Sequence, residues 1–522
     1  MIPKRYILTL IFIFTFLISY SQAFTKTYAA AQNSVATAIC TSSDGNLILV
    51  GESAYSFGGY TGADLLVMKL TKMGDTLWTQ HITRDTSMLT DYFEEGTAVL
   101  ENREGDIVVA ATGWNGGPDD LGGVLVKLDQ SGSVLQTKMN TSIRPYDLIE
   151  TSSGRLMAVG TGFYSFAGPR AQVAMFDKNL NMLWTIQYSS FSEEEGGLRG
   201  LCEMSPNEFV LGGFVNSSGI SNAMVSSCDS LGNINWSREL QSGISYHGFV
   251  QKLTKYDDST FIAVGRTIVP SQYSNAAAWK LKLDGWEDWM LNGVGAYQNG
   301  QTQFNDVVVT SEMNIVMVGV YDTTSSWTGS EGLFYELDAS GNVLKSNLMK
   351  EPVPMAFNGV VEDENTFFIV GEHGASGNYD AAFLRNKFIL NDSLCGITVH
   401  NEGGVTSLNF AYGGYIPTTN SSVGDQAYDF DQAFGVNLET HCEHDSDLAT
   451  SKYQSSINYY PNPSSGLITI EDYYGSYQIY DLSGKLLRLG EVVDGGTISL
   501  EGLEPAFYIV KLNSHLIKVL KI

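Results

Sequence analysis

A four-strand pattern that recurs seven times constrains the fold of this chain more than any other feature. Each copy has an apolar strand, a polar turn, a second apolar strand that ends in a small residue, a Gly-rich loop, a third strand, and a turn that leads into a fourth. Seven such units of about 50 residues predict an all-β fold, a seven-bladed β-propeller. The small residues that mark the copies are Gly51, Ala111, Gly160, Gly212, Gly265, Gly319 and Gly371.

The strands of each unit are apolar runs without strict alternation of polar and apolar residues. A blade has two faces, and in a ring of blades its neighbours cover both, so both sets of side chains are buried. Polar turns that end in glycine, such as residues 129–132 and 338–341, fit the tight hairpins between these strands. The pattern therefore favours a closed ring in which no blade is stable alone.

The segment directly after the expected leader indicates how the ring closes. Residues 24–28 resemble the fourth strands that begin near Trp78 and Trp184. We therefore expect the N-terminal segment to supply the outer strand of the seventh blade, which joins the first and last blades and removes an exposed edge.

Residues 1–22 have the pattern of a secretory signal peptide. Lys4 and Arg5 precede an apolar run over residues 7–17, and small residues follow at Ser19, Ser21 and Ala23. The run is shorter than the ~20 residues that a membrane-spanning helix needs, and no later segment is long enough. We expect an exported mature chain with no membrane-spanning segment.

The net charge of −27, from 30 Lys and Arg against 57 Asp and Glu, repels phosphate groups and anionic lipids. The charge balance thus argues against nucleic acid as a partner.

Export makes the five cysteines candidates for disulfide bonds. Cys395 and Cys442 flank a stretch rich in Gly, Asn and Ser, and we expect them to pair. Cys40, Cys202 and Cys228 fall inside strands, where we expect buried free thiols. We interpret residues 396–442 as an elaboration of the last blade within a propeller domain of residues 23–442, followed by a linker over residues 443–456.

Residues 457–522 have a different character. Short strands with alternating polarity are separated by turns, which predicts a small antiparallel β-sandwich of the immunoglobulin-like kind. Its motifs, at the C-terminal end of the chain, open with Tyr-Pro-Asn-Pro-x-x-Gly, continue with Tyr-Asp-Leu-x-Gly-Lys, and end with Tyr-Ile-Val before Lys-x-x-Lys-Ile. They contain Tyr460, Pro461, Asn462, Pro463, Gly466, Asp481, Gly484, Lys485 and Tyr508.

This segment closely resembles the type A C-terminal sorting domain of the type IX secretion system of Bacteroidetes. It departs from that pattern at Pro505 and Ala506, where the family usually has glycine before its aromatic pair. The resemblance implies recognition by the type IX secretion machinery, passage through the periplasm and outer membrane, and a location at the cell surface or outside the cell. It also implies that the sorting domain is removed on export. Propellers upstream of such domains have no single activity.

The sequence contains no motif that requires a cofactor. His441, Cys442 and His444 are potential metal ligands, but a site needs three or four converging ligands, and Cys442 is expected in a disulfide. No nucleophile elbow, phosphate-binding loop or calcium loop is present. We therefore expect no cofactor and no metal.

One group of residues is a candidate ligand-binding site. Aromatic and polar residues lie near the start of the first strand in several units, and in a propeller these strands begin around one mouth of the central channel. Aromatic rings beside amides and carboxylates suit a sugar or peptide. The alternative is that the aromatics pack between blades while Asp and Asn cap turns. The residues are Tyr146, Asp147, Arg199, His247, Phe304, Asn305, Asp306, Phe357 and Asn358.

These features support an exported, cell-surface or released protein, with a non-catalytic binding or adhesion module as the leading hypothesis. A secreted hydrolase or lyase that acts on polysaccharide is the alternative. That alternative predicts two carboxylates, or a His/Tyr pair, with raised pKa values in one mouth of the channel. A scaffold that binds no ligand is a third hypothesis.

Overall fold

The computed structural model describes a propeller and a separate C-terminal unit. The described residues are 22–29, 33–57, 60–84, 93–114, 122–140, 143–164, 168–189, 196–217, 220–240, 247–268, 274–294, 301–322, 330–349, 355–375, 378–386, 397–399, 404–406, 416–420, 430–431, 437–445, 459–460, 466–470, 475–480, 486–492, 497–512 and 515–521. One unit is built from residues 24–442 and the other contains residues 443–522. No helix occurs within these ranges, and so none of them contains a helix able to span a membrane.

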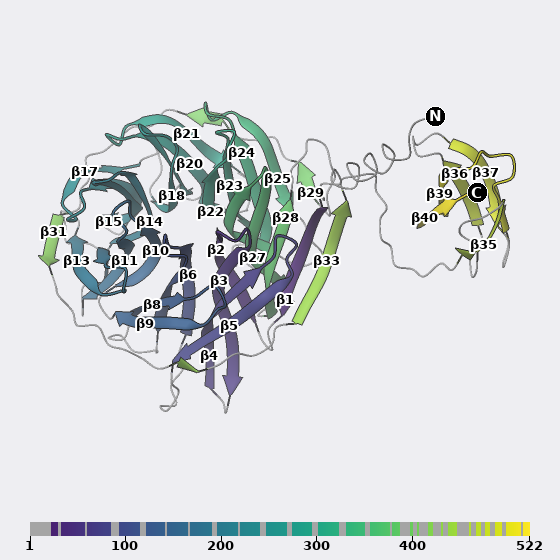
Figure 1. Ribbon diagram of the computed structural model, residues 1–522. Coiled ribbons are helices and arrows are strands. Elements are labelled where there is room, and N and C mark those ends of the chain that lie inside the picture. The colour runs from purple at the N-terminus through teal and green to yellow at the C-terminus, as the bar shows by residue number, and fades with distance from the viewer. Residues whose placement is uncertain are drawn as a thin grey trace, which may run out of the picture. The chain divides into compact units, whose positions relative to one another are not determined.

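The described strands of the propeller form seven antiparallel blades around a central axis (Figure 1), which confirms the predicted fold. Blades 1 and 2 are also joined by one bridging pair, Ala63 with Phe93. Blade 1 contains β2 (Ser34–Thr41), β3 (Leu47–Phe57), β4 (Tyr60–Leu70) and β5 (Thr76–Arg84); blade 2 contains β6 (Phe93–Glu101), β7 (Ile107–Trp114), β8 (Gly122–Leu128) and β9 (Val134–Asn140). Blade 3 contains β10 (Arg144–Glu150), β11 (Leu156–Tyr164), β12 (Gly168–Phe176) and β13 (Met182–Ser189); blade 4 contains β14 (Gly196–Ser205), β15 (Glu208–Ser217), β16 (Ile220–Cys228) and β17 (Ile234–Glu239).

Blades 5 to 7 repeat the arrangement, and the innermost strand of each is the first listed. Blade 5 contains β18 (His247–Lys255), β19 (Thr260–Ile268), β20 (Ser274–Lys282) and β21 (Glu287–Val294). Blade 6 contains β22 (Gln301–Val309), β23 (Ile315–Asp322), β24 (Ser330–Leu337) and β25 (Val343–Met349). Blade 7 contains β26 (Met355–Asp363), β27 (Thr366–Ala375), β28 (Asn378–Asn386) and β1 (Gln22–Ala29).

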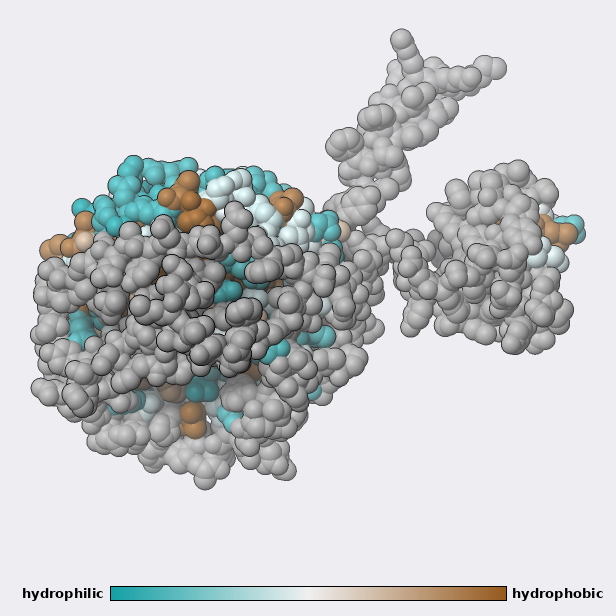
Figure 2. Space-filling model, turned by 90° about the horizontal axis from the view of Figure 1, so that it is seen from below, coloured by the Kyte–Doolittle hydropathy of each residue, from teal (hydrophilic) through white to brown (hydrophobic). Residues whose placement is uncertain are grey.

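The hydrophobic core lies between the blades. One cluster joins Ile262 and Trp289 of blade 5 to Phe304 and Tyr335 of blade 6, and every side chain of β8 and β23 is buried. This burial on both faces is the reason the strands read as apolar runs. Cys202 and Cys228 are buried, Cys40 is partly buried, and all three are free thiols, as predicted. Figure 2 shows the hydrophobic residues on the described surface in small separate groups among hydrophilic ones.

The N-terminal strand closes the ring, as the sequence predicts. β1 pairs antiparallel with β28, from Phe24 opposite Arg385 to Tyr28 opposite Ala381. Tyr28 is buried and donates a hydrogen bond from its hydroxyl to the carbonyl of Gly74 in blade 1, at 2.7 Å. Tyr188, in the fourth strand of blade 3, makes the same 2.7 Å bond to Gly232 of blade 4. β1 therefore has the contacts of an ordinary fourth strand.

The segment after blade 7 encircles the propeller instead of elaborating the last blade alone. Its short strands pair with the outer edges of blades 6, 5, 3, 1 and 7 in chain order, and β29, β31 and β33 are visible at the rim in Figure 1. An outer strand has one unpaired edge, and a passing segment satisfies it without needing an apolar sequence, which is why no repeat marks this region. The strands are β29 (Ile397–Val399), β30 (Gly404–Thr406), β31 (Ile416–Asn420), β32 (Phe430–Asp431) and β33 (Asn437–Asp445).

Two predictions near this segment stay predictions. The proposed disulfide involves Cys395, which lies outside the described residues, and the side chain of Cys442 in β33 is not described. The expected leader, residues 1–22, lies outside the described residues except at Gln22. β33 ends at Asp445, three residues into the expected linker, and the rest of that linker also lies outside.

The C-terminal unit is the small two-sheet domain that its sequence predicts. β34 (Tyr459–Tyr460), β35 (Leu467–Ile470) and β38 (Thr497–Ser499) form one sheet. The other contains β37 (Leu486–Val492), β36 (Gly475–Tyr480), β39 (Phe507–Leu512) and β40 (His515–Leu520) in that order. Its core includes Ile468, Ile479, Ile498 and Val510, and the Tyr508 hydroxyl donates to the Glu504 carbonyl at 2.6 Å. Pro461, Asn462, Pro463, Asp481, Gly484 and Lys485 lie outside the described residues, as does the side chain of Tyr460.

Candidate functional site

The innermost strand of every blade has a β-bulge at the same level. One residue of each strand is left unpaired between two residues that pair with the second strand, as Asn305 is between Phe304 and Asp306. A bulge redirects a side chain out of the ordinary alternation, and bulges are frequent beside functional sites. The seven bulged residues are Thr37, Thr97, Tyr146, Arg199, Gln251, Asn305 and Asn358.

The bulges explain the glycines that mark the repeat. Gly319 pairs with the residue before the bulge, and a Cβ built on it would lie 1.9 Å from the carbonyl oxygen of Gln303. The same collision, at 1.8–1.9 Å, occurs at five other blades. In blade 4 the equivalent position is Gly213, not Gly212, because Leu198 pairs with Gly213. In these six blades only a residue without a side chain allows so close an approach of the two backbones, whereas blade 2 has Ala111 at the equivalent position.

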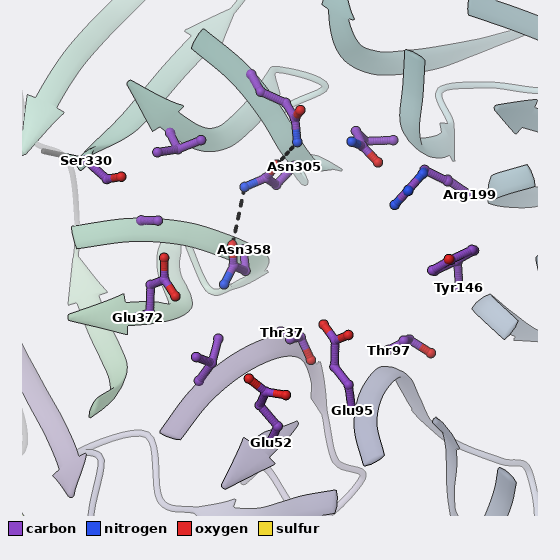
Figure 3. A pocket seen from close by; sticks show the side chains of 15 residues that line it. Thr37, Glu52, Glu95, Thr97, Tyr146, Arg199, Asn305, Ser330, Asn358 and Glu372 are labelled. Atoms are coloured by element: carbon purple, nitrogen blue, oxygen red, sulfur yellow. Dashed lines mark hydrogen bonds between the residues drawn. The ribbon is translucent and has the colours of Figure 1, made fainter. Parts of the chain in front are cut away.

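All seven bulged residues line one cavity on the propeller axis. The cavity has a volume of about 560 Å³ and lies where the innermost strands begin. Figure 3 shows side chains from different blades pointing into it. Its polar lining is completed by Glu52, Glu95, Gln303, Ser330 and Glu372.

Four of the bulged residues also tie each blade to the next. Their side chains donate hydrogen bonds to the backbone carbonyl just before the neighbouring bulge. Thr97 donates to Pro145 at 3.0 Å, Asn305 to Phe357 at 2.8 Å and Asn358 to Ala36 at 3.0 Å; Thr37 makes the equivalent bond to Gly96. The polar lining in blades 6, 7, 1 and 2 is therefore partly structural.

Asp147 and Asp306, which directly follow two of the bulges, form a second set of hydrogen bonds between blades. Asp147 accepts a hydrogen bond from the N–H of Leu201 in blade 4 at 2.9 Å, and Asp306 accepts one from Val360 in blade 7 at 2.9 Å. Lys252 lies 2.6 Å from Asp147. Burial alone would lower the pKa of Lys252, but Asp147 and Asp306 outweigh it and raise that pKa. These three charges therefore stabilise the ring.

Blades 3, 4 and 5 contribute a cluster of three arginines, of which Arg199 lines the cavity while Arg144 and Arg266 lie behind its lining residues. The guanidinium of Arg199 lies 4.6 Å from the centre of the Tyr146 ring, Arg144 lies 5.7 Å from the same ring, and Arg266 lies 4.8 Å from that of Phe249. The Nε atoms of all three arginines are buried and have no hydrogen-bond partner among the described residues. Burial, followed by the charge of Arg199, lowers the pKa of Arg266. The aromatic rings hold the arginines in place while leaving these N–H groups unsatisfied.

Blades 7, 1 and 2 contribute an acidic wall. Glu52 and Glu95 point into the cavity from neighbouring blades, while Tyr146 and Arg199 lie on another side of it (Figure 3). Burial, and then repulsion by Glu95 and Glu372, raises the pKa of Glu52 to about 7. Burial raises the pKa of Glu95 against the opposing effect of Arg144 and Arg199, and burial also raises that of Glu372. The cavity is thus polarised across the axis.

The candidate binding residues predicted from the sequence have different positions and roles in the structure. Tyr146, Arg199, Asn305 and Asn358 line the cavity, whereas Asp147 and Asp306 tie blades together.

Phe304 and Phe357 do not line the cavity. Phe304 is fully buried with its ring 5.6 Å from that of Tyr335, and Phe357 packs against Gly332. Their place one residue before the bulge turns them between the blades. His247 begins β18, and its side chain lies outside the described part of the chain.

Sequence reasoning missed most of the charged lining. Glu52 and Glu372 each directly follow a glycine that marks the repeat within a second strand, so aligning the repeats on these glycines was a signal that could have found them. Glu95 and Arg144 lie two residues before a bulge and pair with the same position of the second strand. Thr37, Thr97 and Gln251 could not be found in this way. They face the cavity because of the bulges, and the apolar pattern of the strands does not reveal where the bulges lie.

The described residues contain no group of three or more His, Cys, Asp or Glu arranged to hold a metal ion. Glu52, Glu95 and Glu372 of the cavity are among these residues and are not arranged to hold a metal ion. The cavity therefore combines the guanidinium of Arg199, three carboxyl groups and a set of amide and hydroxyl groups, which suit the binding of a polar organic molecule.

The fold and the axial cavity define the protein as a seven-bladed β-propeller. The C-terminal unit identifies the pathway by which the protein is exported, because residues 458–521 match the family of secretion system C-terminal sorting domains. The chain is therefore an exported propeller protein that the type IX secretion system carries to the cell surface or the extracellular space. No curated protein matches the chain.

Solved structures similar to this chain include propellers with different roles. One is an inactive virginiamycin B lyase from Staphylococcus aureus with quinupristin, at 9% identity, 70% and 99% coverage of the two chains, and a TM-score of 0.45. Another is the WD40 domain of coronin from Toxoplasma gondii, which is 11% identical, with 71% of this chain and 86% of that chain covered and a TM-score of 0.42. A protein of unknown function from Dyadobacter fermentans is 11% identical, with 69% and 97% of the two chains covered and a TM-score of 0.40. Similarity at this level carries no argument about a ligand.

Proposed function

We propose that this exported protein is a binding module whose axial cavity recognises an acidic carbohydrate, one that carries a carboxylate. The observation that carries the proposal is the guanidinium of Arg199, which lines the cavity and whose buried Nε–H group, like those of Arg144 and Arg266 beside it, has no hydrogen-bond partner among the described residues. A buried donor without an acceptor costs about 1–3 kcal/mol. A ligand carboxylate supplies the acceptors, and arginine binds carboxylates through paired N–H groups.

The other groups of the cavity favour a carbohydrate as the carrier of that carboxylate. Gln251 and Gln303 add amide groups, and Glu52 and Glu372 add acceptors that suit sugar hydroxyls. The cavity lies on the axis and is lined by residues of all seven blades, which fits an oligosaccharide or a chain end better than the flat face of a protein.

The net charge of −27 does not oppose this choice. At physiological salt the interaction between exposed charges decays over about 8 Å, so Arg199 beside the ligand decides its binding. The negative surface slows the approach of an acidic ligand but leaves the local contacts intact.

Calorimetry of the exported protein with a trigalacturonate, and with the neutral trigalactoside as a comparison, tests the proposal. We expect binding of the acidic trisaccharide only. Arg199→Gln should weaken it by about tenfold or more, the loss expected for a charged hydrogen bond. Arg155→Gln is the matched control, because Arg155 is exposed at the turn before β11. Equal binding of the two sugars, or unchanged binding by the Arg199 variant, would contradict the proposal.

A polysaccharide hydrolase or lyase is a second candidate, and one observation favours it. Glu52, Glu95 and Glu372 are carboxyl groups with raised pKa values in one cavity, the arrangement that the enzymatic alternative predicts. Incubation of the exported protein with polyuronates, followed by analysis of chain length, distinguishes binding from cleavage.

A further inference from the structure

The acidic wall is difficult to explain by binding alone. Neutral amides could accept hydrogen bonds from sugar hydroxyls equally well, so binding of an anion does not require three partly buried carboxyl groups in the same cavity, where like charges repel and burial of a charge is costly. Glu52, Glu95 and Glu372 come from three consecutive blades of the ring and line the same cavity as Arg199. Acid–base chemistry on the bound ligand explains why these groups are placed there.

We propose that the cavity cleaves its acidic glycan by β-elimination, with Glu95 as the base and Glu52 as the acid. The inference rests on the proposed function, because Arg199 must first hold the carboxylate of the sugar. The substrate class is a uronic-acid polymer or oligosaccharide whose glycosidic oxygen is attached β to that carboxylate.

The placement of Glu95 fits the base. It lies in β6 two residues before the bulge at Thr97, and it interacts with both Arg144 and Arg199. A carboxylate held by Arg199 therefore lies in the same cavity as Glu95. Burial raises the pKa of both groups, but the charges of Arg144 and Arg199 oppose this rise at Glu95, whereas neighbouring carboxyl groups add to it at Glu52.

The placement of Glu52 fits the acid. It lies on the second strand of blade 1, directly after Gly51, with Glu95 and Glu372 as its charged neighbours. Burial and these two carboxyl groups raise its pKa to about 7, so a large share of Glu52 carries a proton at neutral pH. A carboxyl group with this pKa is suited to protonate a leaving oxygen.

The reaction is balanced without water or a co-reactant. Glu95 removes the proton from the carbon α to the carboxylate, and the electron pair forms a carbon–carbon double bond as the glycosidic C–O bond breaks. Glu52 gives its proton to the departing oxygen. The products are an unsaturated uronide and a shortened chain with a new hydroxyl, and the two glutamates then exchange protons with solvent.

The arginines favour elimination over hydrolysis. Removal of the α-proton places negative charge on the substrate carboxylate, and cationic donors fixed at that position stabilise the transition state more than the ground state. Hydrolysis develops positive charge at the anomeric carbon and needs no cation beside the carboxylate.

The test is incubation of the exported protein with polygalacturonate and, separately, with alginate. We expect growth of the ultraviolet absorbance of the conjugated double bond and products one water lighter in mass than hydrolytic fragments. Glu95→Gln and Glu52→Gln should each lower the rate by about 100-fold or more. Both variants should still bind the polymer, and Glu312→Gln, at an exposed turn, is the matched control.

The outcomes separate the two proposals. Binding of a polymer without a new double bond, or release of saturated fragments, overturns elimination and leaves the binding function standing. Absence of binding to both polymers and to the trisaccharide overturns both. If a variant is less stable than the control by thermal denaturation, the pH profile decides, because Glu52→Gln alone must remove the limb of the rate that depends on the acid.

Discussion

The side chain of Asn358 in blade 7 donates a hydrogen bond from Nδ2 to the backbone carbonyl of Ala36 in blade 1, at 3.0 Å, between residues 322 positions apart in the chain. The pair joins the last innermost strand to the first. Together with the pairing of β1 and β28, it closes the ring at both its inner and its outer radius. The lining of the cavity and the closure of the fold therefore share a residue.

Asn358→Ala should lower the free energy of unfolding by about 1–2 kcal/mol, because it leaves the carbonyl of Ala36 without its partner. Urea denaturation of the exported protein measures the change. Asn235→Ala is a suitable control, since Asn235 is exposed and, among the described residues, its side chain bonds to Ser227 of its own hairpin. A cost for Asn358→Ala no larger than that of the control would show that this bond does not hold the ring.

The bulge register can be tested at a single glycine. Gly319→Ala brings a Cβ to within 1.9 Å of the Gln303 carbonyl, so the strands must separate, and we expect a loss of at least about 2 kcal/mol. In Gly113→Ala the nearest atom lies 3.7 Å from the new Cβ, and we expect little change. Similar denaturation midpoints for the two variants would rule out the close approach described for this register.

Stability should depend on pH through Glu52. Its pKa is about 7 in the folded protein against an ordinary value of 4.5, so between these values the folded state keeps a proton that the unfolded state releases. The stability contributed by that proton is complete below pH 4.5 and is lost as the pH rises to about 7, by at most about 3 kcal/mol.

Glu52→Gln should flatten this part of the stability profile and make the protein more stable than the parent at pH 8. Glu95 and Glu372 contribute a slope of the same sign, because burial raises their pKa values as well. Denaturation midpoints at pH 4.5 and pH 8 for the parent, Glu52→Gln and Glu312→Gln check the sign. A parent protein that gains stability across this window would refute the assignment.

The sorting domain should govern location and not the fold of the propeller. Because the chain divides into separate compact units, removal of residues 457–522 should leave the propeller folded but retain it inside the outer membrane. Fractionation and immunoblotting of periplasm, cell surface and medium measure this. Undiminished appearance of the truncated chain outside the cell would contradict the role of the domain.

The sequence predicts the architecture well because the fold depends on features that leave a local pattern. Apolar runs, turn glycines and a small residue in each second strand repeat in every blade, although the second strands continue past that residue, as β3 does from Gly51 to Phe57. The resemblance of residues 24–28 to a fourth strand reveals the closure. Those signals come from burial on both faces and from backbone crowding, which act on each residue separately.

The charged cavity was harder to predict because it depends on which residues meet across the axis. Arg144, Arg199 and Arg266 lie far apart in the chain, and a shift of one residue at a bulge decides whether a side chain faces the channel or the next blade. Phe304 and Asn305 illustrate this: neighbours in sequence, one is in the core and the other lines the cavity. The strands after blade 7 left no apolar signal, since they cover edges and not faces.

A crystal structure of the exported protein with a bound oligouronate tests the central claim most directly. The account predicts a ligand carboxylate within hydrogen-bonding distance of the guanidinium of Arg199, with the sugar ring extending toward Glu52 and Glu95. A ligand bound on the outer surface of the blades, with the Nε–H group of Arg199 still unpartnered, would contradict it.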